Sequence, residues 1–175
     1  GTVQVSDGTL NLGLLNTTGG IGSWIRTGGA VNINAALNNA ASSFTLDNST
    51  GSWTLNGGSI NGGSVDFGGS AQLLVAAVNA NLLTDVDING DVILSTGSAR
   101  TRVTGATRFD ALRLQNNATS LSVAPGYTLL DDVIAEGAAA GTRLIEMNGS
   151  AGTFTVGASG SITHAAGAGG DFVVG

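Results

Sequence analysis

Residues 53–67 read WTLNGGSINGGSVDF, and this stretch decides the fold. An apolar residue recurs at every fifth position, at Leu55, Ile60 and Val65, and Asn-Gly-Gly-Ser fills each gap. Glycine reaches positive φ without a steric penalty, so each Gly-Gly pair predicts a turn. The apolar segments between the turns are too short for a helix but suit short strands. We therefore expect a winding chain with these three side chains on its inner wall and glycines at its corners.

Short segments of alternating apolar residues, separated by glycine-containing corners, recur over the whole chain. Val3 and Val5 alternate near the start, and Val31 and Ile33 do so further on. Roughly 20–25 residues per coil predict about eight coils in residues 1–175, each stacked on the last. Parallel crossover connections are overwhelmingly right-handed. We predict one all-β domain, a single-stranded right-handed parallel β-helix (β-solenoid).

The secondary structure of two segments stays open. Residues 71–83, AQLLVAAVNANLL, place Leu74, Val78 and Leu82 four residues apart, which is typical of a short helix. Short buried strands fit the same residues, because periodicity does not distinguish brief apolar runs. Residues 35–43 are rich in alanine and asparagine and are expected to form a loop or a shallow helical turn.

The composition restricts the function. Of the 175 residues 42% are hydrophobic and only 10% are charged, where ordinary domains carry about 25%. The net charge is −6 and lysine is absent, so nucleic-acid binding, which depends on phosphate neutralisation, is not expected. Cysteine is absent, and no apolar run is long enough to span a bilayer. The chain begins and ends within its strand pattern, so we expect a segment of a longer chain whose open edges associate end to end.

Several segments resemble a known class of proteins. LSVAPGYTLLDDV at residues 121–133 and INGDVILS at residues 88–95 resemble the long repetitive surface proteins of Gram-negative and planctomycete-type bacteria. The opening GTV, with GTLNLG at residues 8–13, is similar to autotransporter-associated β-strand repeats, and GSIT at residues 160–163 fits the same class. The resemblance implies a secreted, right-handed parallel β-helix that serves as a stalk, passenger or fibre.

Residues 85–91, DVDINGD, form the sharpest candidate site. Oxygen ligands at alternate positions followed by glycine are how an EF-hand-type loop wraps Ca²⁺. Position 12 of such a loop is Thr96 here, where a bidentate glutamate is required. The interpretation that we favour is a strand with Val86 and Ile88 inward, closed by an Asn-Gly turn, whose carboxylates attract a cation only weakly. The candidate ligands are Asp85, Asp87, Asn89 and Asp91.

Four of the six positive charges lie close together, at Arg100, Arg102, Arg108 and Arg113. Guanidinium groups bind carboxylates through two hydrogen bonds, so these residues are candidates for a groove that holds a carboxylated polysaccharide. The alternative, which we favour, is that arginine and aspartate side chains on adjacent coils pair as cross-strand neighbours. Among the aromatic residues, Trp53 alternates with Leu55 and is expected inward. Trp24 lies in a glycine-rich corner and is the candidate for an exposed sugar-stacking surface.

These observations predict a structural segment of a large extracellular bacterial surface protein, namely a stalk, a fibre or an adhesin shaft. The expected partners are neighbouring segments of the same protein or identical subunits, with surface polysaccharide as a further candidate. The alternative function is a carbohydrate-binding or polysaccharide-cleaving β-helix that uses the arginine-bearing outer face. No residues form a pattern that only catalysis requires, so we do not expect an enzyme, and no cofactor beyond weakly bound Ca²⁺ is expected.

Overall fold

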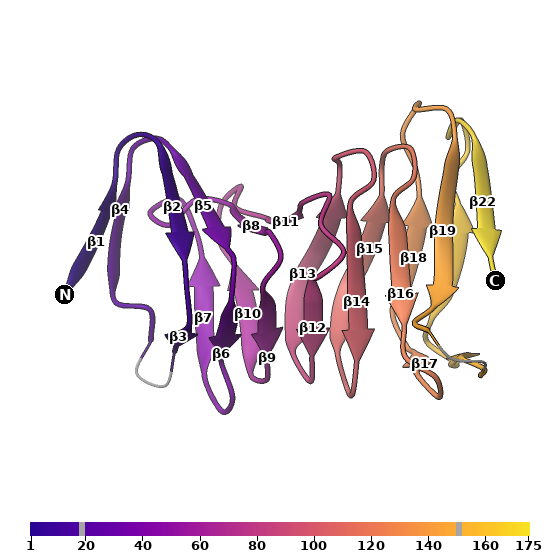
Figure 1. Cartoon of the computed structure of the whole chain (residues 1–175), viewed down its shortest axis with the longest axis horizontal. Helices are drawn as coiled ribbons and strands as arrows, with labels where there is room; N and C mark the ends of the chain where they lie inside the picture. The colour runs from indigo at the N-terminus through magenta and orange to yellow at the C-terminus, as the bar shows by residue number, and fades with distance from the viewer. Residues whose placement is uncertain (18–19, 150–151) are drawn as a thin grey trace.

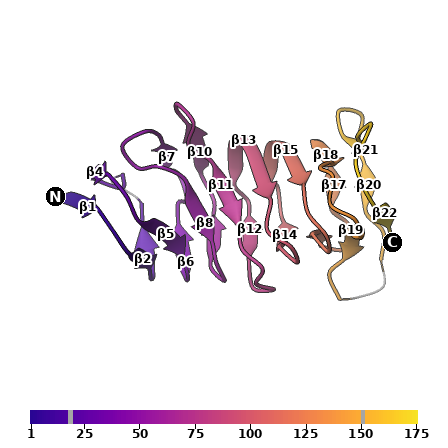
Figure 2. The same ribbon diagram turned by 90° about the horizontal axis from the view of Figure 1, so that it is seen from above.

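The computed structural model describes residues 1–17, 20–149 and 152–175, and these residues form strands but no helix. The strands are parallel and stack as a β-solenoid of about seven turns, with the two termini at opposite ends of the long axis (Figure 1). Figure 2 shows the same succession of coils from above. The predicted all-β parallel solenoid is confirmed. In the described part of the chain no helix is long and apolar enough to cross a membrane.

Each coil contributes to three walls, and two of the walls run unbroken through eight strands each. Wall 2 consists of β2 (Thr9–Leu12), β5 (Ala30–Ile33), β8 (Trp53–Leu55), β11 (Leu73–Val75), β13 (Asp87–Leu94), β15 (Arg108–Leu114), β18 (Asp132–Ala135) and β21 (Ser161–His164). Wall 3 consists of β3 (Leu15–Asn16), β6 (Ala36–Asn38), β9 (Ser59–Asn61), β12 (Leu82–Thr84), β14 (Arg100–Thr104), β16 (Ser120–Val123), β19 (Thr142–Met147) and β22 (Asp171–Val174).

Wall 1 is interrupted twice. Its first part is the pair β1 (Thr2–Val5) and β4 (Ser23–Arg26). Its second part runs through β7 (Ser43–Leu46), β10 (Ser64–Phe67) and the first residues of β13 and β15, which then bend into wall 2. Its third part is the pair β17 (Thr128–Leu129) and β20 (Thr155–Val156). Within the described residues, β4 therefore does not pair with β7, and β15 does not pair with β17.

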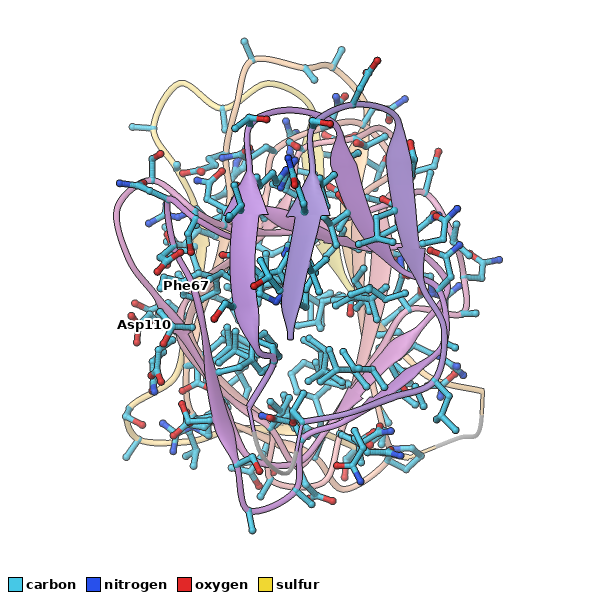
Figure 3. The ribbon with its side chains drawn as sticks, turned by 90° about the vertical axis from the view of Figure 1, so that its left-hand side faces the viewer. Phe67 and Asp110 are labelled. Atoms are coloured by element: carbon cyan, nitrogen blue, oxygen red, sulfur yellow. The ribbon has the colours of Figure 1, made fainter. Side chains whose placement is uncertain are left out.

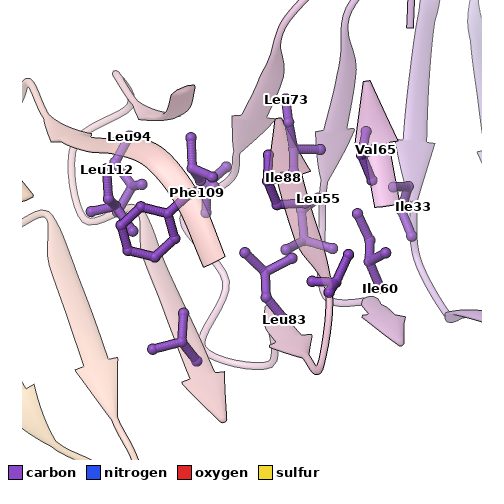
Figure 4. Close-up of a cluster of buried hydrophobic side chains, with 14 of the residues drawn as sticks. Ile33, Leu55, Ile60, Val65, Leu73, Leu83, Ile88, Leu94, Phe109 and Leu112 are labelled. Carbon is purple, nitrogen blue, oxygen red and sulfur yellow. The ribbon is translucent and has the colours of Figure 1, made fainter. Parts of the chain in front are cut away.

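The core forms as the 53–67 stretch predicts. Leu55 lies on wall 2, Ile60 on wall 3 and Val65 on wall 1 of the next coil, and all three side chains are fully buried. Each meets apolar neighbours from the coils before and after it (Figure 4). Burial of one such side chain stabilises the fold by roughly 1.5–3 kcal/mol. Figure 3, which looks along the long axis from the N-terminal end, shows side chains filling the interior.

The two ambiguous segments both contain strands. In residues 71–83 the chain forms β11 and the start of β12, because an extended β11 places Leu73 and Val75 in the core and in register with β8. The helical alternative for this segment is wrong, since a helix would remove β11 from the ladder of wall 2. Residues 35–43 contain β6, whose Leu37 is fully buried, so the expected loop is wrong for residues 36–38. It is confirmed for residues 39–42, which form a turn before β7.

The Asn89-Gly90 dipeptide does not form the expected tight turn. It lies inside the continuous strand β13, where the pairing with β15 shifts register between Ile88 and Asp91. This irregularity bends the strand from wall 1 into wall 2. A Cβ atom on Gly90 would lie 2.4 Å from Cδ2 of Phe67, so the packing of this ring against the bend leaves no room for a side chain at position 90.

Candidate functional site

The four clustered arginines lie on three different walls. Arg100 and Arg102 share the outer face of β14 in wall 3, as their spacing predicts. Arg108 begins β15 in wall 1, and Arg113 lies further along the same strand in wall 2. The structure therefore does not bring the four guanidinium groups into one groove, because the solenoid turns a corner between each pair of neighbouring walls.

Arg108 and Arg113 form ion pairs between coils. Nη2 of Arg108 lies 2.7 Å from Oδ1 of Asp131, whose other oxygen accepts a 3.3 Å hydrogen bond from the Phe109 N–H. The hydrogen bond to Asp131 raises the pKa of Arg108. Burial raises the pKa of Asp131 above its usual range, although the guanidinium of Arg108 acts in the opposite direction. For Arg108, the structure therefore shows the expected ion pair between an arginine and an aspartate on the adjacent coil.

On wall 2, Arg113 links three consecutive coils. Its Nε donates a hydrogen bond to Oδ2 of Asp91, and its Nη1 lies 3.0 Å from Oε2 of Glu136. The hydrogen bond to Asp91 is the largest cause that raises the pKa of Arg113. Both contacts hold one coil to its neighbour and leave the guanidinium little capacity for a ligand.

The two arginines of wall 3 differ. Arg100 reaches across Ser122 to Glu146, with Nη2 2.8 Å from Oε1 of the carboxylate. The guanidinium of Arg102 makes no hydrogen bond and no ion pair with any described residue, and its Nε is buried without a partner. Arg102 is therefore the strongest remaining candidate for contact with a ligand.

The acidic stretch does not converge on one point. Asp85 lies at a corner with φ 51° and accepts a 2.8 Å hydrogen bond from the Ala106 N–H. Asp87 and Asn89 point outward from an extended strand, and Asp91 follows on wall 2, where it binds Arg113. The strand interpretation, with Val86 and Ile88 buried, is confirmed. No group of three or more metal-ligating side chains is found among the described residues.

The predicted exposure of Trp24 is wrong. Its side chain is 7% exposed, its Nε1 donates a 2.8 Å hydrogen bond to the Ile21 carbonyl, and its ring centroid lies 4.9 Å from that of Trp53. Trp53 is fully buried as predicted and stacks on Phe44 at 5.6 Å. Phe44 and Trp53 both belong to the coil after that of Trp24, so the apolar environment of Trp24 comes from residues about 20–30 positions later.

Sequence reasoning missed two arginines that bind backbone carbonyls. Arg143 is fully buried and donates to the carbonyl oxygens of Leu114, Gly137, Ala139 and Gly169. Arg26 similarly donates to the carbonyl oxygens of Gly28, Gly29, Thr50 and Ser52. Each guanidinium thereby binds several carbonyl oxygens at once, although those of Leu114 and Gly137 also accept backbone hydrogen bonds from Glu136 and Gly169. The sequence signal was a single arginine close to glycine-containing corners.

The interruptions of wall 1 coincide with two cavities. The one between β4 and β7 has a volume of about 450 Å³, and Trp24, Phe44 and Asp47 are among its lining residues. The one between β15 and β17 has a volume of about 390 Å³ and is lined in part by Tyr127, whose hydroxyl donates a 2.8 Å hydrogen bond to the Thr107 carbonyl. Burial raises the pKa of Tyr127 to about 12, so this hydroxyl is a donor throughout the physiological range.

Comparison of the chain with models of known protein families, with curated protein sequences and with solved structures finds no match. The function is therefore argued from the geometry of the solenoid and of its outer faces.

Proposed function

We propose that this chain is a structural segment of a large extracellular bacterial surface protein, acting as a stalk, a fibre or an adhesin shaft. The observation that carries the proposal is that arginine side chains connect neighbouring coils. Five of the six arginines bind groups on adjacent coils or corners and thereby hold the coils together. Such contacts stiffen a rod.

The repetitive architecture supports the same proposal. Each coil pairs only with the coil before and the coil after it, through parallel ladders on walls 2 and 3. In such a quasi-one-dimensional fold, stability is the sum of coil and interface terms, so the rod can be extended without a new core. The resemblance of the strand-and-turn segments to repetitive bacterial surface proteins supports the extracellular setting.

The end strands support association with further coils. Asp171 and Gly175 donate their N–H groups to wall 3 carbonyls of the preceding coil at 2.9 and 3.0 Å. Because N–H direction alternates along a strand, the N–H of Val174 faces away from β19, toward the open edge of β22. Val173 and Val174 are also 44% and 48% exposed. Such an edge is a template for another parallel strand, either from a neighbouring segment or from an identical copy.

The test is negative-stain electron microscopy of the purified chain over a concentration series. We expect filaments that lengthen with concentration and keep the width of one solenoid. Val174→Pro removes the outward N–H donor and should shorten the filaments, whereas Val174→Thr, which keeps the donor, is the matched control. Short rods of uniform length at every concentration would contradict end-to-end association.

A second candidate function, carbohydrate binding, is favoured by Arg102, whose guanidinium makes no hydrogen bond or ion pair with the described residues. Polysaccharide cleavage receives less support than binding, because Arg108 and Arg113 lie on other walls and are held by carboxylates.

A further inference from the structure

Arg102 differs from every other arginine in this chain. Charged residues are only 10% of the sequence, and the other guanidinium groups each bind a carboxylate or several carbonyl oxygens. Arg102 is half-buried on the outer face of wall 3 and has no side-chain partner among the described residues. An unpaired, partly desolvated cation is costly in a fold whose other cations are paired, so its presence requires a reason.

The surroundings of Arg102 are fixed by the register of wall 3. Leu82 lies beside it on the preceding coil and Ser122 on the following coil. Glu146 lies in the same row one coil further on, but its carboxylate is already bound by Arg100. This part of the face therefore carries one positive charge that no carboxylate of the described chain neutralises, although the whole chain is acidic.

A row of neutral polar side chains runs along the solenoid axis and ends on the strand of Arg102. It is formed by one residue from each of four consecutive coils, namely Asn38, Asn61, Thr84 and Thr104. Successive members lie about one strand spacing, ~4.8 Å, apart. The hydroxyl oxygens of Thr84 and Thr104 are 3.2 Å apart, and Nδ2 of Asn61 lies 3.3 Å from Oδ1 of Asn38. The side chains of this row can donate hydrogen bonds to, and accept them from, the hydroxyl groups of a ligand that extends over several coils.

We propose that this part of wall 3 binds a carboxylate-bearing polysaccharide along the solenoid axis. Arg102 would bind a uronate carboxylate through its planar fork, which matches the two carboxylate oxygens. Thr84 and Thr104 would bind sugar hydroxyl groups, and Leu82 would contact the apolar C–H face of a ring. The row of amides and hydroxyls favours an extended polymer over a small carboxylate, because it continues the polar contacts over the three coils that precede Arg102.

The experiment is a titration of ¹⁵N-labelled protein with sodium polygalacturonate, followed by the backbone amide and arginine Nε–Hε signals. We expect the largest shifts at Arg102, Leu82 and Thr84. Arg102→Gln should weaken binding by about tenfold or more, as loss of a charge-assisted hydrogen bond predicts. The matched control is Arg113→Gln, which removes the same charge from wall 2 and should leave the affinity unchanged. Absence of binding to the wild-type chain, or equal weakening by both variants, would overturn the proposal.

Three further measurements test whether the fold is intact and which chemical groups of the ligand are recognised. Arg102→Gln should unfold thermally close to the wild-type temperature, because its guanidinium has no hydrogen bond or ion pair with the described residues to lose. Weakened binding would then not reflect misfolding. Arg102→Lys should bind polygalacturonate more weakly than wild type, since lysine keeps the charge and loses the fork. Dextran sulfate or poly-glutamate binding as tightly as polygalacturonate would overturn the assignment to a carboxylated polysaccharide and indicate general anion binding or an acidic peptide, respectively.

Discussion

The outer faces of the solenoid are held together differently in its two halves. In residues 1–84, the amide half, asparagines stack on asparagines: Nδ2 of Asn32 lies 3.1 Å from Oδ1 of Asn11 on wall 2, and Asn61 meets Asn38 on wall 3. From residue 85 onward, the ionic half, arginines meet carboxylates at equivalent places. All four ion pairs among the described residues lie there.

The difference follows from which side chains can pair with an identical side chain on the next coil of a parallel stack. An amide both donates and accepts, so the same residue can recur on any number of coils, as in the asparagine ladders of cross-β structures. Like charges repel, so a charged row must alternate in sign. Asp91, Arg113 and Glu136 alternate in sign on three consecutive coils as diagonal neighbours, since the register partners of Arg113 are Ile93 and Ile134. The amide half is thus extended by simple repetition, whereas the ionic half requires a specific order of coils.

The largest effect should come from Arg143→Met in the ionic half. Removal of this buried guanidinium leaves the carbonyl oxygens of Ala139 and Gly169 without a donor and takes one of two donors from those of Leu114 and Gly137, and we expect a loss of about 3 kcal/mol. Hydrogen exchange should accelerate in β16 and β19 but not in β5 and β8, because coils interact only with near neighbours. Arg26→Met in the amide half is the comparison, with a smaller loss because Arg26 is only half-buried. Uniform acceleration over all coils would contradict the division into halves.

The next largest effect should come from Arg108→Gln. It leaves the buried carboxylate of Asp131 without its counter-charge, which should cost about 1–3 kcal/mol at pH 7. The pKa of Asp131 is raised above 3.8 in the folded chain, so the folded state takes up its proton first and gains stability as pH falls through that raised pKa. The deficit of the variant should therefore shrink in urea unfolding at pH 4. An equal deficit at pH 7 and pH 4 would contradict this role for Asp131.

High salt should destabilise the ionic half more than the amide half, by less than the two substitutions above. Surface ion pairs contribute about 0.2–1 kcal/mol each and are screened at high ionic strength, whereas neutral amide pairs are not. Raising NaCl from low to molar concentration should accelerate hydrogen exchange in β15, β18 and β19 and leave β5, β6 and β9 unchanged. A matched response of both sets would mean that the ion pairs contribute nothing measurable.

The smallest effect is expected for Asp66, a carboxylate at the boundary of the amide half. Hydrogen bonds from Ser43 and Asn89 lower the pKa of Asp66 below 3.8. Its stabilising contribution is therefore complete above pH 3.8 and is lost as pH falls through the folded-state pKa, opposite in sign to Asp131. Asp66→Asn should flatten the acid limb of the unfolding curve recorded by the fluorescence of Trp24 and Trp53. An unaltered acid limb would rule out this contribution.

The solenoid and its inward-facing positions could be predicted from the sequence alone. Leu55, Ile60, Val65 and Trp53 were predictable because the spacing of apolar residues and glycine corners is a local property that every coil repeats. The same local reasoning placed Arg100 and Arg102 on one outer face. It also identified Val86 and Ile88 as core residues.

The pairing of residues between adjacent coils could not be predicted from the sequence and became clear from the structure. Leu10 pairs with Val31, 21 residues on, but Val133 pairs with Ile162, 29 residues on, so no single period gives the register. The alignment of the coils buries Trp24 against Trp53 and places residues 73–75 in strand β11 and not in a helix. It also brings carbonyl oxygens to Arg143 and no carboxylate to Arg102. The physical reason is that turns and alternation arise within a coil, whereas partners arise between coils, where the length of each corner sets the alignment.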